Sequence, residues 1–123
     1  MLSIGVDLIE LERMTRALSH ARARFLERVY TPAEQAFYSD RLDELAVRFA
    51  GKEAISKALG TGIYGIAWTE MEILPDSRGK PMVTLYGRAL ARARELGLTE
   101  WAISLSHSDH YAIAMVVAQG MPE

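Results

Sequence analysis

The sequence predicts an α+β fold in which a mainly antiparallel sheet packs against helices. Two observations support this fold class. Several short segments have the two-residue apolar period of β-strands, and longer segments have the three- and four-residue apolar spacing of amphipathic helices. Their order along the chain is strand, helices, two strands, helix and two strands, as in α+β domains. Because 123 residues are enough for one core, we expect a single domain over residues 1–123.

The first part of the chain predicts one strand followed by helical structure. In residues 3–8, apolar side chains alternate with Gly5 and Asp7, which predicts a strand that ends at or near Asp7. Residues 10–29 then have a helical period, and a break is expected near Ser19 because serine competes for backbone hydrogen bonds. The strand is therefore expected to lead directly into two short helices.

The later elements have recognisable start and stop signals. Residues 31–34, Thr-Pro-Ala-Glu, predict a helix start with a capping box. A longer helix is predicted over residues 43–59, and Gly60 and Gly62 end it. The remaining predicted elements are strands at residues 69–74 and 82–86, a helix at 87–96 that Gly97 ends, and strands at 101–106 and 111–118.

The composition excludes several kinds of site. The chain has no cysteine, so it has no disulfide, thiolate zinc site or cysteine nucleophile. Any metal would have to be bound by carboxylates, imidazoles or backbone oxygens, which favours a hard cation such as Mg²⁺. The N-terminal residues do not have the pattern of a secretion signal, and no apolar run approaches the ~20 residues needed to span a bilayer. We therefore expect a cytoplasmic protein that does not enter a membrane.

Basic side chains are concentrated near the N-terminus. The formal net charge is −2, but residues 13–28 contain five arginines and His20 against one acidic residue, Glu27. At helical spacing, one face carries Arg13, Arg16, His20, Arg24 and Arg28. A nucleic-acid-binding domain is usually basic overall, so a local basic face on an acidic chain indicates an acidic protein partner and not a nucleic acid.

Asp7 is the first candidate functional residue. A carboxylate beside residues that should be buried needs a cation or several hydrogen-bond donors. Aspartate is also a favoured helix cap. Asp7 is therefore either a cap of the following helix or a metal ligand.

Residues 48–60, with the sequence RFAGKEAISKALG, are the most informative segment. Glu53, Ser56 and Lys57 are three and four residues apart and share one helix face. That face also carries Phe49, so the glutamate is less free to be solvated than on a charged face. Glu53 and Lys57 are either an exposed ion pair without function or part of a site.

The third cluster is SLSHSDH at residues 104–110, which ends a strand with two histidines and three serines. Such groups can bind phosphate, and they also form ordinary polar turns. Two carboxylates, a lysine and a histidine are nevertheless suited to phosphate chemistry. Mg²⁺ bound through one or two carboxylates leaves positions for phosphate oxygens, and a lysine can offset charge on a leaving phosphate. Spacing alone does not show that the three clusters meet.

These segments resemble those of holo-acyl-carrier-protein synthases, the small single-domain phosphopantetheinyl transferases. The matching stretches are IGVDLIE at residues 4–10, RFAGKEAISKALGTG at 48–62 and SLSHS at 104–108. The middle stretch is the most specific, and the resemblance covers nearly the whole chain. It implies the phosphopantetheinyl transferase fold and an enzyme of fatty acid biosynthesis. Such an enzyme moves the phosphopantetheine arm of coenzyme A to a serine of apo-acyl carrier protein and releases adenosine 3′,5′-bisphosphate.

The resemblance also implies roles for individual residues. Asp7 and Glu53 would bind Mg²⁺ together with the coenzyme A diphosphate, and Mn²⁺ would suit the same ligands. Lys57 would act near the phosphates as a catalytic residue. The residues expected to bind coenzyme A are Ser56, Lys57, Gly60, His107 and Ser108.

Partners follow from the same resemblance. The basic residues expected to dock the acidic acyl carrier protein are Arg13, Arg16, Arg24 and Arg28. Members of the family that resemble this chain form compact homotrimers with active sites between neighbouring subunits. Val47 and Gly51 depart from the family pattern, and because neither is a proposed metal ligand they affect only the expected packing of the helix.

Two other functions remain open from the residues alone. A small metal-dependent phosphoesterase would use the same Asp, Glu and His with water as the nucleophile. A non-enzymatic α+β module would bind nucleotides or protein partners through the same surface.

Overall fold

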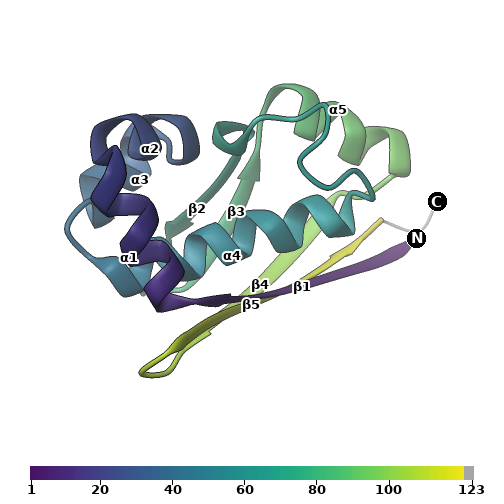
Figure 1. The fold of residues 1–123 in the computed structure, drawn as a ribbon. Coiled ribbons are helices and arrows are strands. Elements are labelled where there is room, and N and C mark those ends of the chain that lie inside the picture. Colours follow the sequence, from purple (N-terminus) through teal and green to yellow (C-terminus); the bar gives the residue numbers. More distant parts are fainter. Residues whose placement is uncertain (121–123) are drawn as a thin grey trace.

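In the computed structural model, which describes residues 1–120, two antiparallel sheets pack with five α-helices. The larger sheet has the strand order β1–β5–β4, and the smaller one pairs β2 with β3. The strands are β1 (Leu2–Glu10), β2 (Met71–Pro75), β3 (Pro81–Leu85), β4 (Glu100–His107) and β5 (Tyr111–Gln119). The helices are α1 (Leu11–His20), α2 (Arg22–Val29), α3 (Pro32–Tyr38), α4 (Leu42–Ala58) and α5 (Gly87–Leu96), with a 3-10 turn, η1, at Trp68–Glu70. The predicted α+β class is confirmed (Figure 1).

Strand β1 is longer than the sequence predicted. It pairs with β5 from Leu2, opposite Gln119, to Glu10, opposite Tyr111. Asp7 is therefore not at the strand end but within it, opposite Ala114. The prediction of the end was wrong because β5 continues to pair with the backbone beyond Asp7.

The covered face of β1 is the less apolar one. Ile4, Val6 and Leu8 are 65, 50 and 60% exposed, whereas Gly5 and Ile9 are buried. The expectation that Asp7 has buried neighbours in sequence is therefore wrong. Helix α4 lies across one face of the sheet that contains β1 (Figure 1). Gly5 is on the face that α4 covers, and the exposed Ile4, Val6 and Leu8 are on the opposite face.

The two helices after β1 separate where the chain was expected to break. Ala21 has φ −150° and ψ 66°, outside the helical region, and lies two residues after Ser19. The predicted capping box of α3 is confirmed. The Thr31 side chain accepts a hydrogen bond from the Glu34 amide, and the Glu34 carboxylate accepts one from the Thr31 amide.

The central part of the chain follows the prediction with small shifts. Helix α4 begins one residue before the predicted start and ends one residue before the predicted end. β2 begins at Met71 instead of residue 69, because Trp68–Glu70 forms the 3-10 turn. Gly97 ends α5 with φ 73°, as expected for a glycine after a helix.

Helix α4 is enclosed by both sheets and by the N-terminal helices. Gly51 in its middle faces β2 and β4, and a methyl group there would come within 2.6 Å of Cδ1 of Ile73 and 3.2 Å of Cδ1 of Ile103. Close packing thus accounts for a glycine in mid-helix despite its low helix propensity. Val47, the other departure from the family pattern, is buried in the core.

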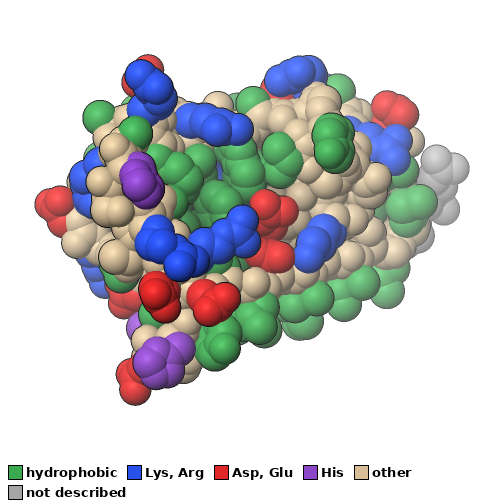
Figure 2. Space-filling model, viewed as in Figure 1, with side chains coloured by type: hydrophobic (Ala, Val, Ile, Leu, Met, Phe, Trp, Pro, Cys, Tyr) green, Lys and Arg blue, Asp and Glu red, His purple; other side chains and the backbone are tan. Residues whose placement is uncertain are grey.

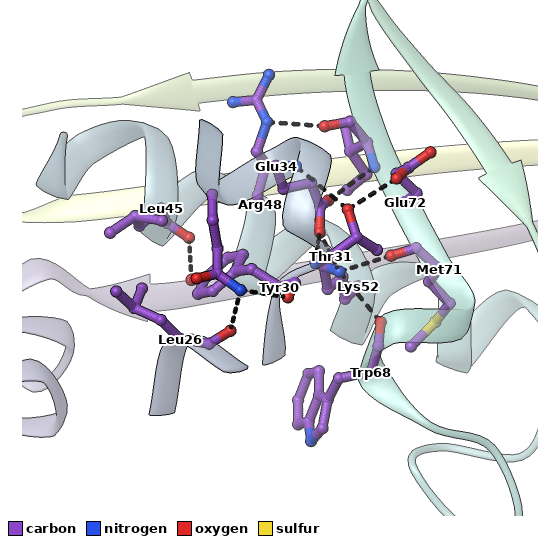
Figure 3. Close-up of polar contacts among 12 residues, drawn as sticks. Leu26, Tyr30, Thr31, Glu34, Leu45, Arg48, Lys52, Trp68, Met71 and Glu72 are labelled. Carbon is purple, nitrogen blue, oxygen red and sulfur yellow. Dashed lines mark hydrogen bonds and ion pairs between the residues drawn. The ribbon is translucent and has the colours of Figure 1, made fainter. Parts of the chain in front are cut away.

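A buried ion pair joins α4 to α3. Nζ of Lys52 lies 2.7 Å from Oε1 of Glu34, and neither side chain has exposed surface. The same ammonium donates to the carbonyls of Trp68 and Met71, and the other oxygen of Glu34 accepts a hydrogen bond from the amide of Ile73 (Figure 3). Since every charged atom has partners, the pair holds α3, α4 and the start of β2 together.

No helix among residues 1–120 combines the length and the apolar character needed to cross a membrane.

Candidate active site

Asp7 points from β1 toward α4 and contacts Lys57. Nζ of Lys57 donates to Oδ1 of Asp7 at 3.1 Å and to the carbonyl of Val6 at 3.0 Å. The side chains of Asp7 and Lys57 are 20 and 51% exposed, so the pair lies at the surface of the β1–α4 contact. The N-cap of α1 is Glu10, and no side chain caps that helix. Asp7 is therefore not a helix cap.

Glu53 lies beside this pair on α4. Burial raises the pKa of Glu53, and the negative charge of Asp7 raises it further, whereas Lys57 and Arg13 lower it. Two carboxylates from different elements thus repel each other in a half-buried place. A bound cation would relieve this repulsion, so the electrostatics favour cation binding.

The arrangement of ligands suits a hard cation that also binds a substrate. Within residues 1–120, no group of three or more His, Cys, Asp or Glu side chains could hold a metal ion by itself. Asp7 and Glu53 provide two carboxylates, and Mg²⁺ is usually bound by one or two carboxylates with water and substrate phosphates in the other positions. The residues present therefore fit Mg²⁺ with a phosphate-bearing substrate.

Ser56 and Gly60, both predicted to bind coenzyme A, differ in their exposure. Ser56 is buried, and its hydroxyl donates to the carbonyl of Glu53 at 2.7 Å. Gly60 is exposed directly after α4 and has φ 76°. In this arrangement only Gly60 has surface available to a ligand.

His107 and Ser108 do not lie beside the two carboxylates in this chain. Nε2 of His107 is 3.3 Å from Oδ2 of Asp43, at the start of α4. Glu53 is ten residues further along the helix, roughly 15 Å at 1.5 Å per residue. Ser108 belongs to the β4–β5 turn, where its amide donates to the carbonyl of Tyr111 at 2.8 Å. The single chain therefore joins Asp7, Glu53 and Lys57 but not the third cluster.

The basic residues predicted to dock a protein are exposed on α1 and α2, as their spacing indicated. Arg24 and Arg28 border a mainly apolar hollow between these helices, whose other lining residues are Ala17, His20, Ala21 and Phe25. Figure 2 shows basic side chains on both sides of a central acidic patch, with an apolar depression next to it. The positive charge of Arg13 lowers the pKa of Glu53, against the larger effects of burial and of Asp7, so the charge of the basic face acts on Glu53.

Two features of the site were missed from the sequence. Phe49 stacks on Trp68 with ring centroids 4.8 Å apart, and Phe25 stacks on Phe49 with ring centroids 6.0 Å apart. This aromatic stack lies on the α4 face one turn before Glu53. Asp43 as the partner of His107 was also missed. Both features join residues that are far apart in the chain, and no local pattern indicates them.

Comparisons with known proteins place the chain in a family. Residues 3–116 match the family model of the 4′-phosphopantetheinyl transferase superfamily. The chain is 48% identical to a holo-[acyl-carrier-protein] synthase of Herpetosiphon aurantiacus, with 98% of this chain and 100% of that protein covered. It is 49% identical to the protein of the same name from Solidesulfovibrio magneticus, with 95 and 97% covered.

Solved structures show the same fold. The holo-[acyl-carrier-protein] synthase of Helicobacter pylori, solved in complex with coenzyme A, has a TM-score of 0.86 and 30% identity, with 94% of this chain and 99% of that chain covered. The corresponding protein of Neisseria meningitidis has a TM-score of 0.85 and 35% identity, with 95 and 97% covered. Both matches extend over nearly the full length of each chain.

Proposed function

The chain belongs to the 4′-phosphopantetheinyl transferase superfamily, and we infer from this that it is a holo-acyl-carrier-protein synthase. It transfers the phosphopantetheine arm of coenzyme A to a serine of apo-acyl carrier protein. The observation that carries this conclusion is the near-full-length identity of 48% to a holo-[acyl-carrier-protein] synthase. The convergence of Asp7, Glu53 and Lys57 at one surface position gives the chain groups suited to the reaction.

We propose that Asp7 and Glu53 bind Mg²⁺, with Mn²⁺ as an alternative ion for the same ligands. The proposal is supported by the carboxylate pair and by the raised pKa of Glu53, because burial and the charge of Asp7 both disfavour the ionised form and a bound cation would favour it. When bound, Mg²⁺ would orient the diphosphate of coenzyme A and offset its negative charge.

The reaction needs a positive group near the leaving phosphate. The serine oxygen of the carrier attacks the phosphorus next to pantetheine, and the bond from that phosphorus to the bridging oxygen breaks. Adenosine 3′,5′-bisphosphate then leaves with the bonding electrons, so negative charge grows on its phosphate. We propose that Lys57 offsets this charge, which is supported by its position beside Asp7 and its 51% exposure.

We also propose that the chain assembles as a homotrimer, with active sites between neighbouring subunits. The outer face of the larger sheet supports assembly, because its exposed residues are largely apolar: Leu2, Ile4, Val6, Leu8, Tyr111, Ile113 and Met115. Figure 2 shows a row of apolar side chains along the edge of the molecule where β1 runs in Figure 1. Monomeric proteins rarely expose a large contiguous apolar surface.

Assembly would also give the third cluster a role. His107 is remote from Asp7 and Glu53 in one chain, but His107 and Ser108 of one copy would contact coenzyme A bound at the carboxylates of another. Ser56 would contribute only if its hydroxyl left the carbonyl of Glu53. A cytoplasmic location remains a prediction from the sequence.

The carrier is proposed to dock on α1 and α2. Acyl carrier proteins are expected to be acidic, and the exposed arginines of these helices provide the opposite charge. The hollow beside Arg24 and Arg28 adds an apolar surface that a side chain of the partner can fill. Charge would speed the encounter, and the hollow would fix the orientation.

The decisive experiment is mass spectrometry of an apo-acyl carrier protein after incubation with this protein, coenzyme A and Mg²⁺. We expect a mass gain equal to the phosphopantetheine arm, and nearly none with Asp7→Ala or Glu53→Ala at unchanged fold. A parallel reaction without carrier identifies a phosphoesterase, which would release products from coenzyme A alone. No mass gain with several acidic carriers would contradict the proposed function.

A further inference from the structure

We propose that Gly5 is a positioning residue that sets the separation of Asp7 and Glu53 by allowing β1 to lie directly against the backbone of α4. This inference rests on the proposed divalent-ion site. It extends that site to a residue that carries no functional group. Gly5 acts through its lack of a side chain, which lets the two backbones approach closely.

Gly5 occupies the closest point between β1 and α4. A methyl group at this position would overlap the carbonyl oxygen of Ala54 and would lie 2.9 Å from its carbonyl carbon and 3.1 Å from the amide nitrogen of Ala58. These are backbone atoms, which cannot rotate aside as a side chain can. Strand or helix would therefore have to move by at least roughly 1 Å before normal contact distances were restored.

The closest point is directly beside the two carboxylates. Asp7 is two residues after Gly5 and therefore on the same face of β1, and Glu53 is the residue before Ala54 on α4. A change in spacing at Gly5 is thus transmitted to the Asp7–Glu53 pair within one or two residues. Mg²⁺ requires near-ideal octahedral geometry with oxygen ligands at roughly 2.0–2.1 Å, so a shift of this size is large for the site.

Side-chain hydrogen bonds hold β1 against α4 on both sides of this point. Oγ of Ser3 donates to the carbonyl of Ala58 at 2.6 Å, and Nζ of Lys57 donates to the carbonyl of Val6 at 3.0 Å. These bonds draw strand and helix together, and Gly5 lets the backbones meet between them. The spacing of the pair is therefore defined by direct backbone contact and not by adjustable side chains.

Gly51 provides a matched control on the same helix. It is also buried, but a methyl group there would meet the side-chain ends of Ile73 and Ile103, which can adjust, and it faces β2 and β4 instead of β1. Gly51→Ala adds the same methyl group to the core and improves helix propensity. Comparing it with Gly5→Ala separates general crowding of the core from a change in the β1–α4 spacing.

The test is titration with Mn²⁺ alone, with the free ion followed by electron paramagnetic resonance in the absence of coenzyme A and carrier. We expect Gly5→Ala to weaken Mn²⁺ binding roughly 10- to 100-fold, as is usual when groups that orient metal ligands are changed. The affinity of Gly51→Ala for Mn²⁺ should stay within about twofold of that of the original chain. Equal binding by Gly5→Ala, with circular dichroism showing a folded chain, would overturn the inference.

A second pair of variants tests the spacing itself. Asp7→Glu lengthens the carboxylate by one methylene, so alone it should weaken Mn²⁺ binding at least roughly tenfold if the β1–α4 spacing is fixed. In the Gly5→Ala background it should recover part of the lost affinity, because the longer side chain spans the wider gap. If Gly5→Ala does not fold, Asp7→Glu alone decides, and binding within twofold of the original chain overturns the proposal.

Failure of the underlying metal site would appear differently. If the unchanged chain binds Mn²⁺ only with coenzyme A present, the same variants are compared with coenzyme A added, because a substrate phosphate completes the proposed site. If the unchanged chain bound Mn²⁺ under neither condition, or if Asp7→Ala bound it equally well, the proposed metal ligands and the role of Gly5 would both be wrong. If only the Gly5 variant behaved like the original chain, the metal site would stand and this inference alone would fail.

Discussion

Lys57 and Asp7 form an ion pair across the β1–α4 contact, with Nζ 3.1 Å from Oδ1. The lysine thus competes with any cation for Asp7, while its charge also lowers the pKa of the neighbouring Glu53. Lys57 therefore opposes metal binding in the free chain. It is also proposed to assist the transfer reaction, in which negative charge develops on the leaving phosphate.

This dual role predicts opposite effects of Lys57→Met on binding and turnover. Removing the positive charge should tighten Mn²⁺ binding to the free chain by roughly fivefold, the effect of about 1 kcal/mol between well-solvated charges. Phosphopantetheine transfer should fall roughly 10²- to 10³-fold in kcat, as when one preorganised donor is lost. Titration with Mn²⁺ and steady-state kinetics measure the two effects.

Lys80→Met is the matched control, since Lys80 is exposed in the β2–β3 turn. Lys80→Met should change neither the affinity for Mn²⁺ nor the kcat of phosphopantetheine transfer. Weaker Mn²⁺ binding by Lys57→Met would show that the lysine supports the geometry of the carboxylates and does not oppose the ion.

The raised pKa of Glu53 predicts a pH-dependent gain in stability for Glu53→Gln. Burial and the charge of Asp7 raise the pKa above 4.5, so the folded chain holds this proton more tightly than the unfolded chain does. The stabilising contribution of the proton is complete below about pH 4.5 and is lost as the pH rises through the raised pKa. Without metal, Glu53→Gln should therefore be more stable than the original chain at pH 7, and the difference should shrink toward pH 4.

Urea unfolding midpoints between pH 4 and pH 8 test this prediction. Glu100→Gln, at an exposed position in β4, serves as the control and should give a much smaller difference. A variant that is less stable than the original chain at pH 7 would mean that the ionised Glu53 makes favourable contacts in the folded state.

Local patterns account for the parts of the fold that were predicted well. The bounds of α4 and the capping box at Thr31 follow from spacing and capping preferences, which depend on residues within a few positions. The face of β1 that α4 covers could not be predicted from such local patterns. Alternation shows that Ile4 and Leu8 share a face, but an apolar face can be covered by the same chain or left for a partner.

The same limit applies to the candidate site. Helical spacing predicted that Glu53 and Lys57 share a face, whereas the approach of Asp7 depends on tertiary packing at Gly5. The Lys52–Glu34 pair gave no sequence signal, because a lysine in a helix is usually solvent-exposed. His107 was grouped with the carboxylates by chemical type, and the register of β4 places it at the other end of α4.

The buried pair predicts a large loss of stability for Lys52→Met. This change leaves Glu34 charged and without its cation in a place with no solvent exposure, which typically costs roughly 3–5 kcal/mol. The double variant Lys52→Met/Glu34→Gln removes both charges and should recover part of the loss. Urea denaturation measures both values, and Lys80→Met is the surface control.

The recovery in the double variant is the critical result. Glu34 also accepts hydrogen bonds from the amides of Thr31 and Ile73, so some of the loss will persist. If the double variant were as unstable as Lys52→Met, the cost would come from the lost hydrogen bonds of the ammonium to Trp68 and Met71 and not from an unpaired charge.

The proposed docking of an acidic carrier on α1 and α2 predicts a salt-dependent effect of charge reversal. Arg24→Glu and Arg28→Glu should each raise the KM for the apo-carrier at low ionic strength and change kcat little, because they act on encounter and orientation. The effect should decrease as salt is added, since exposed charges are screened. Arg94→Glu, at an exposed position on α5, is the control.

Arg13→Glu should have a larger effect that includes kcat, because Arg13 also acts on the charge of Glu53. An unchanged KM for the carrier at low salt in Arg13→Glu would remove the basic face from the docking proposal.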